Sequence, residues 1–278
     1  MSYRQWRTIE LPDVRLELLD RASGDPLLLI PTALTADEFE PVADRLARSG
    51  RYRVLTHRRR GYSALSPQTG VPSVGRDALD CRRLLEAVGV RRCHVAGLSY
   101  SAAVALELAR AAPGLVASLT LLEPPPLFVS STPEFLEANE RLIADFASAG
   151  GATALDGFLR RLMGDDWREA YERLLPGSVA QMERDAAAFF TADAHALLAW
   201  RFGDDEARHI RCPVLHIGGT RSGTWFAEVR SQLLAWFPSA RDVRVEGADH
   251  SLALTHPDDI ATAMDAFLRD QPLSGSAR

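Results

Sequence analysis

Segments with the pattern of β-strands alternate with segments with the pattern of amphipathic helices, and this alternation constrains the fold more than any other feature. The predicted strands are short apolar or alternating runs at residues 5–11, 14–19, 26–31, 52–57, 93–98, 117–123, 213–219 and 242–247. The predicted helices lie at residues 37–49, 75–88, 100–112, 224–236 and 257–269. Strands joined by helices of this length form βαβ units with right-handed crossovers. The sequence therefore predicts an α/β fold with a doubly wound, mostly parallel sheet.

Residues 126–209 interrupt the alternation. This stretch has no strand pattern and contains helical stretches at residues 133–148, 152–163, 167–174, 178–190 and 193–201. It follows the sixth predicted strand, so its helices are expected to form a lid over the carboxyl edge of the sheet, where open α/β sheets bind ligands. We therefore predict a core made of residues 1–125 and 210–278, with a helical lid at 126–209.

Composition excludes several classes of function. The net charge of −5 comes from interspersed acidic and basic residues, which argues against a nucleic-acid partner. All of the basic residues are arginine, so a lysine Schiff base and a P-loop lysine are excluded. Cys81, Cys93 and Cys212 have neither disulfide nor zinc spacing. We therefore expect free thiols and no metal or cofactor.

The sequence also bears on location. No apolar run approaches the length of a membrane span, and the first residues lack the apolar stretch of a signal peptide. We therefore expect a cytoplasmic protein with no membrane partner. The oligomeric state is not predicted.

The segment HVAGLSYSAAVALELA carries the strongest functional signal. Ser99 stands at a sharp turn between a predicted strand and a predicted helix, with Gly97 before it and Ser101 after it. Such a turn lifts the serine hydroxyl clear of the backbone, where the N–H groups at the start of the helix face developing negative charge. The Tyr100 N–H is then one oxyanion donor. The alternative is a serine that only caps the helix.

This elbow and other segments resemble the α/β-hydrolase superfamily, specifically its serine hydrolases with a helical lid, over residues 5–269. The segments that carry the resemblance are PTALT (31–35), RRRGYS (58–63), AGLSYS (96–101), LLEPPP (121–126), PVLHIGG (213–219) and GADHSLALTHP (247–257). The sequence departs from the pattern G-x-S-x-G, because Ser101 replaces the second glycine.

The resemblance implies a general base and an acid. The family's catalytic histidine lies on the loop after the last strand, where this chain has His250. The family's usual aspartate after strand 213–219 is replaced by Ser222, and the next carboxylate is Glu228. Some members supply the acid from the end of the preceding strand, and Glu123 stands there. The alternative for Glu123 is a bond to nearby loop backbone.

The oxyanion loop also departs from the family. Pro31 and Thr32 replace the common His-Gly pair, and the second backbone donor corresponds to Ala33. The amide of Ala33 needs no particular side chain, so the hole is still expected. Hydroxyls of Thr32 and Thr35 are candidates for additional donors.

The resemblance predicts a serine hydrolase that cleaves a small ester, lactone or thioester through an acyl-Ser99 intermediate. The expected partner is a small, apolar substrate. Two alternatives stay open: a carbon–carbon bond hydrolase or lyase with the same Ser/His pair, and a non-catalytic ligand-binding homologue. A scaffolding role has little support. Serine rather than aspartate at the elbow argues against epoxide hydrolases and haloalkane dehalogenases.

Overall fold

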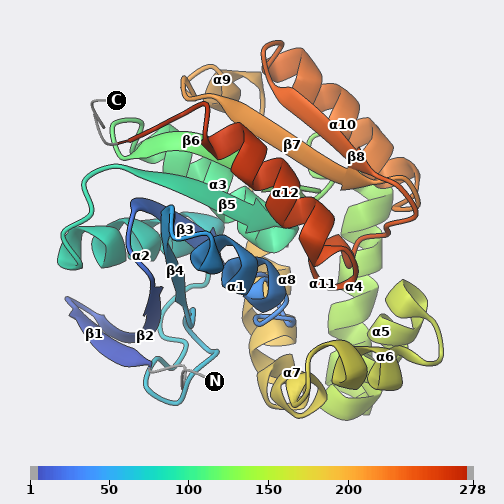
Figure 1. The fold of residues 1–278 in the computed structure, drawn as a ribbon. Helices are drawn as coiled ribbons and strands as arrows, with labels where there is room; N and C mark the ends of the chain where they lie inside the picture. The colour runs from blue at the N-terminus through green and yellow to red at the C-terminus, as the bar shows by residue number, and fades with distance from the viewer. Residues whose placement is uncertain (1–5, 274–278) are drawn as a thin grey trace.

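The computed structural model describes residues 6–273, and its centre is an eight-stranded sheet (Figure 1). The strands are β1 (Arg7–Leu11), β2 (Val14–Arg21), β3 (Asp25–Ile30), β4 (Tyr52–His57), β5 (Cys93–Leu98), β6 (Val116–Leu122), β7 (Val214–Gly219) and β8 (Arg241–Val245). Their order is β1-β2-β4-β3-β5-β6-β7-β8. β2 pairs antiparallel with β1 and β4, and all other neighbours pair in parallel. The predicted doubly wound, mostly parallel sheet is confirmed.

Helices cover both faces of this sheet. The longer ones outside the insertion are α1 (Glu40–Arg48), α2 (Val74–Ala87), α3 (Tyr100–Ala111), α10 (Thr224–Trp236) and α12 (Pro257–Leu268). One apolar cluster joins α1 and α12 to one face, and α12 lies across the sheet in Figure 1. A second cluster joins α2, α3 and α10 to the opposite face. The central strands β5 and β6 are buried along their whole length, although each carries polar side chains.

The helical insertion follows β6, as predicted, and forms the group of helices at the lower right of Figure 1. It consists of α4 (Thr132–Ala149), α5 (Gly151–Met163), α6 (Trp167–Leu174), α7 (Ser178–Ala188), a π-helical turn η1 (Phe189–Asp193) and α8 (Ala194–Ala199). Helices α4 to α7 and the turn η1 share their own apolar cluster, which also takes in Leu34 from the loop after β3 and Leu254 from a short helix after β8. Helix α8 instead packs with the core cluster that contains α2, α3 and α10. The insertion therefore packs onto the segments that follow β3 and β8. The boundaries at 126 and 209 stay a prediction.

The structure corrects several predicted boundaries. The helix predicted at 37–49 begins at Glu40, because residues 36–39 form turns in which the Glu38 N–H bonds to the Thr35 carbonyl and the Glu40 N–H to the Asp37 carbonyl. Pro41 then suits the first helical turn. Two short helices, α9 (Asp204–Ala207) and α11 (Leu252–Thr255), were not predicted. Residue 5, the predicted start of the first strand, lies outside the described residues.

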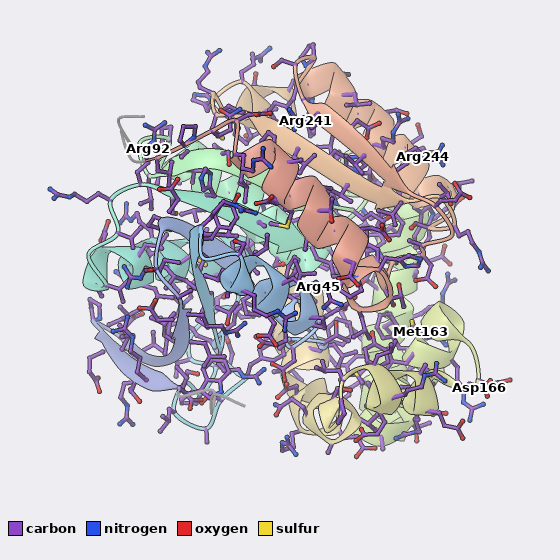
Figure 2. The ribbon with its side chains drawn as sticks, viewed as in Figure 1. Arg45, Arg92, Met163, Asp166, Arg241 and Arg244 are labelled. Atoms are coloured by element: carbon purple, nitrogen blue, oxygen red, sulfur yellow. The ribbon has the colours of Figure 1, made fainter. Side chains whose placement is uncertain are left out.

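Among the helices within residues 6–273, none is both long and apolar enough to cross a membrane. Arginine side chains such as Arg92, Arg241 and Arg244 project from the surface of the sheet and its helices (Figure 2).

Candidate active site

Ser99 occupies a strained turn between β5 and α3. Its φ of 52° and ψ of −121° lie in a region that side chains with a Cβ rarely adopt. A Cβ on Gly97 would come within 2.2 Å of the Ser101 carbonyl oxygen, so glycine is required where the helix passes the strand. The Ser99 N–H donates to the carbonyl of Leu122 at the end of β6 (2.9 Å), which ties the turn to the neighbouring strand.

Ser101, where the family pattern has glycine, supports this turn. Its buried hydroxyl accepts from the Leu98 N–H (2.9 Å) and donates to the Leu98 carbonyl (3.0 Å). The hydroxyl therefore stabilises the residue just before Ser99, and a glycine at this position would leave the Leu98 N–H without its side-chain acceptor.

Glu123 follows β6, and its carboxylate has a partner at each oxygen. Its side chain is 1% exposed. Oε1 accepts from the Gly219 N–H at the end of β7 (2.7 Å), and Oε2 lies 2.7 Å from Nδ1 of His250. Glu123 therefore contacts His250 and also bonds to backbone, at the end of a strand and not in a neighbouring loop.

His250 lies on the loop between β8 and α11, and its ring is fixed from two sides. Glu123 contacts Nδ1, and the ring of Phe226 stacks on the imidazole at 4.2 Å between centroids and 16° between planes. Asp249 points elsewhere, since it accepts from the Ser251 N–H (3.0 Å). Glu228 accepts from the Ser131 N–H (2.9 Å). Of the carboxylates weighed from the sequence, Glu123 is the one that the structure brings to His250.

The loop at 31–35 follows β3 on the other side of the elbow. Leu34 has a φ of 59°, and its N–H donates to the Tyr62 hydroxyl (2.8 Å). The hydroxyls of Thr32 and Thr35 donate to the Leu98 carbonyl (2.8 Å) and to Oε2 of Glu38 (2.6 Å). Both hydroxyls therefore already donate to other acceptors, and the prediction that they act as additional oxyanion donors is not supported.

Ser99, His250, Ala33 and Tyr100 all line one cavity of about 670 Å³ between the sheet edge and the lid. Its apolar wall includes aromatic residues from the lid and from α10: Phe135, Phe158, Tyr171, Phe189, Trp225 and Phe226. Charged residues also reach it, namely Glu38, Arg141, Asp145, Arg161, Arg221 and Asp249. Two further aromatic residues near the end of the insertion, Trp200 and Phe202, instead pack in the core beneath.

Glu38 was missed by the sequence analysis. It is buried at the cavity wall, and its Oε1 has no hydrogen-bond partner. Burial raises the pKa of its carboxyl to about 7; the like charges of Asp249 and Glu123 add to this, whereas Thr35 and His250 oppose it. A solvated loop glutamate and a buried one have the same sequence pattern, so the sequence held no signal for this group.

Backbone strain is concentrated at this cavity. Within residues 6–273, four non-glycine residues have positive φ, and three of them, Leu34, Ser99 and Glu123, belong to the loops described above. Such strain persists where surrounding contacts over-determine the backbone, and it clusters at functional sites.

The other histidines lie away from the cavity. Burial lowers the pKa of His57 to about 3 and that of His94 to about 4, so both are neutral at pH 7. Nδ1 of His216 lies 2.8 Å from Asp242. Cys81, Cys93 and Cys212 are free thiols. Within the described part of the chain, no group of three or more His, Cys, Asp or Glu side chains is arranged to hold a metal ion.

Comparison with known proteins agrees with this architecture. The sequence profile described as the alpha/beta hydrolase family matches residues 27–263. The chain belongs to the α/β-hydrolase family.

Individual proteins with a similar sequence or structure include esterases and a lactonase. The pimeloyl-[acyl-carrier protein] methyl ester esterase of Aromatoleum aromaticum is 30% identical over 186 residues, which cover 63% of this chain and 73% of the relative. A carboxylesterase structure from Nitrososphaera gargenis has a TM-score of 0.80 at 19% identity, covering 95% of this chain and 98% of that one. The enol-lactonase from Burkholderia xenovorans LB400 has a TM-score of 0.79 at 18% identity, covering 95% and 100%. At these identities the two structures establish the fold.

This α/β hydrolase therefore carries three departures from the family pattern in one site. Ser222 stands where an aspartate is usual, and the carboxylate next to His250 comes from Glu123 instead. Ser101 replaces a glycine and braces the elbow. Pro31 and Thr32 replace the common His-Gly pair. The family and the hydrolase class predicted from the sequence are confirmed.

Proposed function

We propose that this protein is a serine hydrolase of carboxylic esters that works through an acyl-Ser99 intermediate, with His250 as general base and Glu123 as its acid partner. The single observation that carries this proposal is the contact of 2.7 Å between Glu123 Oε2 and His250 Nδ1, in a cavity that Ser99 also lines. With its other oxygen held by the Gly219 N–H, Glu123 fixes the imidazole tautomer that leaves Nε2 free to accept a proton.

The reaction follows from these roles. The Ser99 oxygen attacks the ester carbonyl carbon while its proton passes to Nε2 of His250. The N–H groups of Ala33 and Tyr100 donate to the oxyanion of the tetrahedral intermediate. His250 returns the proton to the departing alcohol, which leaves acyl-Ser99. Water then attacks the acyl carbon, gives its proton to His250, and the carboxylic acid is released as the serine is reprotonated.

The substrate class is inferred from the cavity and from the relatives. Aromatic and aliphatic side chains form much of the wall, which suits an acyl chain or another apolar group. The relative from Aromatoleum aromaticum is a methyl ester esterase, and a structural neighbour is an enol-lactonase. We propose a small ester with an apolar portion as the substrate, with lactones and thioesters as chemically equivalent candidates.

The proposal is tested with p-nitrophenyl esters of C4 to C10 acids, a δ-lactone, a thioester and a fluorophosphonate probe. We expect ester hydrolysis and a single covalent adduct that peptide mapping places on Ser99. Ser99→Ala is expected to lose the adduct and about 10³-fold or more of kcat. Ser231→Ala, which removes an exposed helix hydroxyl, is the control and should retain both.

Other outcomes select the alternatives. A protein that binds these esters, yet neither turns them over nor reacts with the probe, is a ligand-binding homologue. Labelling of Ser99 without hydrolysis of any ester, lactone or thioester would instead favour carbon–carbon bond cleavage with the same pair.

A further inference from the structure

Arg59 is a buried arginine next to the loop at 31–35, with a side chain only 2% exposed. Its Nε donates to the Pro31 carbonyl (3.0 Å) and its Nη2 to the Thr32 carbonyl (3.3 Å). Both carbonyls belong to the two residues just before Ala33. The guanidinium therefore holds the backbone on one side of the Ala33 amide.

Tyr62 holds the backbone on the other side. Its hydroxyl accepts from the Leu34 N–H (2.8 Å) and donates to Oδ2 of Asp193 (2.5 Å). The side chain is buried, and the Arg59 guanidinium lies 4.6 Å from the centre of its ring. Arg59 and Tyr62 thus fix the residues that flank Ala33, although neither lines the cavity.

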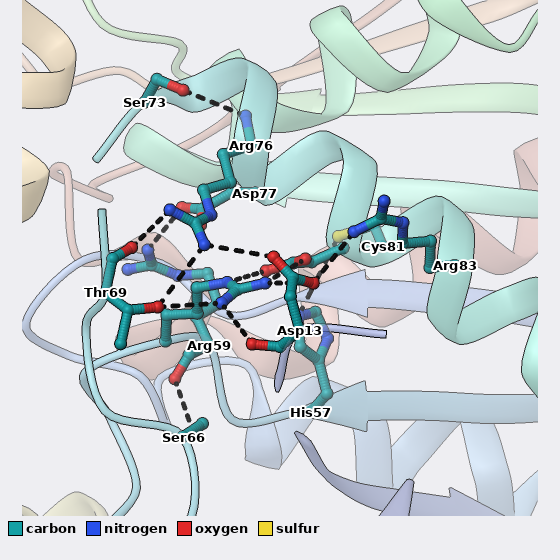
Figure 3. Close-up of polar contacts among 12 residues, drawn as sticks. Asp13, His57, Arg59, Ser66, Thr69, Ser73, Arg76, Asp77, Cys81 and Arg83 are labelled. Carbon is teal, nitrogen blue, oxygen red and sulfur yellow. Dashed lines mark hydrogen bonds and ion pairs between the residues drawn. The ribbon is translucent and has the colours of Figure 1, made fainter. Parts of the chain in front are cut away.

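The charge on Arg59 is balanced by two carboxylates, one from α2 and one from the lid, and the one from the lid is buried. Asp77 on α2 lies 2.9 Å from Nη1, and Asp193 in the π-turn of the lid lies 2.7 Å from Nη2. Burial opposes the charged guanidinium, yet Asp193 and Asp77 hold the pKa of Arg59 well above its ordinary value. Figure 3 shows Arg59 and Asp77 beside a neighbouring cluster in which Asp13 contacts Arg76 and Arg83.

The Arg59 guanidinium also lies next to Tyr100, the residue after Ser99. The ring of Tyr100 lies 4.6 Å from the Arg59 guanidinium, and its hydroxyl donates to Asp77 (2.9 Å). The backbone N–H of Tyr100 is the other proposed oxyanion donor. The Arg59 guanidinium therefore contacts both the backbone before Ala33 and the side chain of Tyr100. The Asp193 carboxylate of the lid is paired with the same guanidinium.

We propose that Arg59 and Tyr62 are positioning residues for the oxyanion hole, and that Asp193 makes the geometry of the hole depend on the seating of the lid. This inference rests on the proposed function, since it assigns a role within the same reaction. Donors to an oxyanion must be placed where charge develops in the transition state, and a displaced donor loses much of its effect. When the lid helix carrying Asp193 moves away, Tyr62 and Arg59 lose a shared partner, and the loop at 31–35 loosens.

Tyr62→Phe tests the positioning role because it removes one oxygen and keeps the ring over Arg59. We expect kcat for a p-nitrophenyl ester to fall about 10- to 100-fold while KM stays within threefold. The inhibition constant of an alkyl trifluoromethyl ketone, which forms an oxyanion on Ser99, should rise in parallel with the loss of kcat/KM. The inhibition constant of the corresponding ether, which has no carbonyl, should stay unchanged.

Tyr52→Phe is the matched control. Tyr52 is also buried and its hydroxyl donates to a carboxylate, Asp265, but it lies on β4 beneath α12, far from the cavity. We expect a comparable loss of thermal stability with unchanged kcat. If the two variants lose stability alike and both keep the wild-type kcat and ketone affinity, Tyr62 is merely structural and the proposal is wrong.

Asp193→Asn tests the coupling to the lid. We expect a loss of kcat and of ketone affinity similar to that of Tyr62→Phe, although Asp193 does not line the cavity. Asp185→Asn is its control, since Asp185 is a buried lid aspartate that bonds to Gln181 on its own helix. Equal effects of the two asparagine variants would contradict a specific link between Asp193 and the hole.

Hydrogen exchange on the wild-type protein gives a measurement that needs no variant to fold. Labelling by the fluorophosphonate should slow exchange in peptides covering residues 31–39 and 189–199 together. Protection confined to one of these segments would overturn the coupling. An inactive wild-type protein that does not react with the probe would instead refute the proposed function, and the two failures are therefore distinguishable.

Discussion

On the sheet side of the cavity, Ser99 and Glu123 have strained backbone, and Glu123 connects the end of β7 to His250. On the loop side, residues 31–38 depend on side chains that arrive from elsewhere. Glu123 is fixed by Gly219 at the end of β7, whereas the loop is fixed by Arg59 and Tyr62 from the segment after β4. The contact that fixes Glu123 therefore lies at the strand ends. The two residues that fix the loop also bond to Asp193 of the lid.

The two sides also treat a buried carboxyl group differently. Both oxygens of Glu123 have partners, one on Gly219 and one on His250. Glu38 has Thr35 at one oxygen and no partner at the other, and burial raises its pKa to about 7. Burial of a carboxyl group with an unpartnered oxygen disfavours its charged form. The sheet side therefore satisfies both oxygens of its buried carboxyl, whereas the loop side leaves one carboxyl oxygen without a partner.

The largest expected effect comes from removing the Glu123 carboxylate on the sheet side. Glu123→Gln keeps the shape of the side chain, but its amide cannot hold His250 in the required tautomer or stabilise the imidazolium. We expect kcat to fall about 10³- to 10⁴-fold, measured by steady-state ester hydrolysis. Glu228→Gln, at the first carboxylate after Ser222, is the control and should keep its kcat. A loss below tenfold for Glu123→Gln would remove Glu123 from the mechanism.

An intermediate effect is expected from Glu38→Gln on the loop side. Because the folded pKa is raised from 4.5 to about 7, the folded protein binds a proton that the unfolded chain releases, and stability falls as pH rises through this window. Glutamine does not titrate, so the stability of the Glu38→Gln variant does not fall with pH for this reason. Its unfolding free energy relative to wild type should rise between pH 4.5 and pH 8 by roughly 3 kcal/mol at most.

Urea denaturation at pH 5, 6, 7 and 8 checks this dependence. Glu140→Gln, an exposed position on α4, is the control and should show no such trend. A constant difference between Glu38→Gln and wild type at all four pH values would show that Glu38 is ionised in the folded protein at low pH as well.

The smallest effect is expected from Ser101→Ala on the sheet side. This change removes the hydrogen bonds to the Leu98 N–H and carbonyl but leaves the backbone of the elbow in place. We expect a loss of about 1–2 kcal/mol of stability and no more than a severalfold decrease in kcat, by thermal denaturation and ester hydrolysis. A decrease as large as that of Glu123→Gln would mean that the hydroxyl, and not backbone strain, holds Ser99 in position.

The sequence located the sheet side better than the loop side. Ser99, Glu123 and His250 each follow a strand, and the carboxyl ends of parallel strands meet at one edge, so their proximity could be anticipated. The loop side resisted prediction because Arg58, Arg59 and Arg60 are adjacent arginines with the same local pattern. Arg59 lies over the loop at 31–35, while Arg60 pairs with Asp80, and this difference appears only once α2 and the lid are packed.

The sequence by itself determined the order of strands and helices, the place of the helical insertion and the elbow at Ser99, because these depend on short-range periodicity and on the demand of a tight turn for small residues. Only the tertiary structure decided that Glu123 rather than Glu228 contacts His250, that Glu38 lies buried, and that Asp193 of the lid meets Arg59. Each of these depends on contacts between segments far apart in the chain, whose desolvation and partners no local pattern encodes.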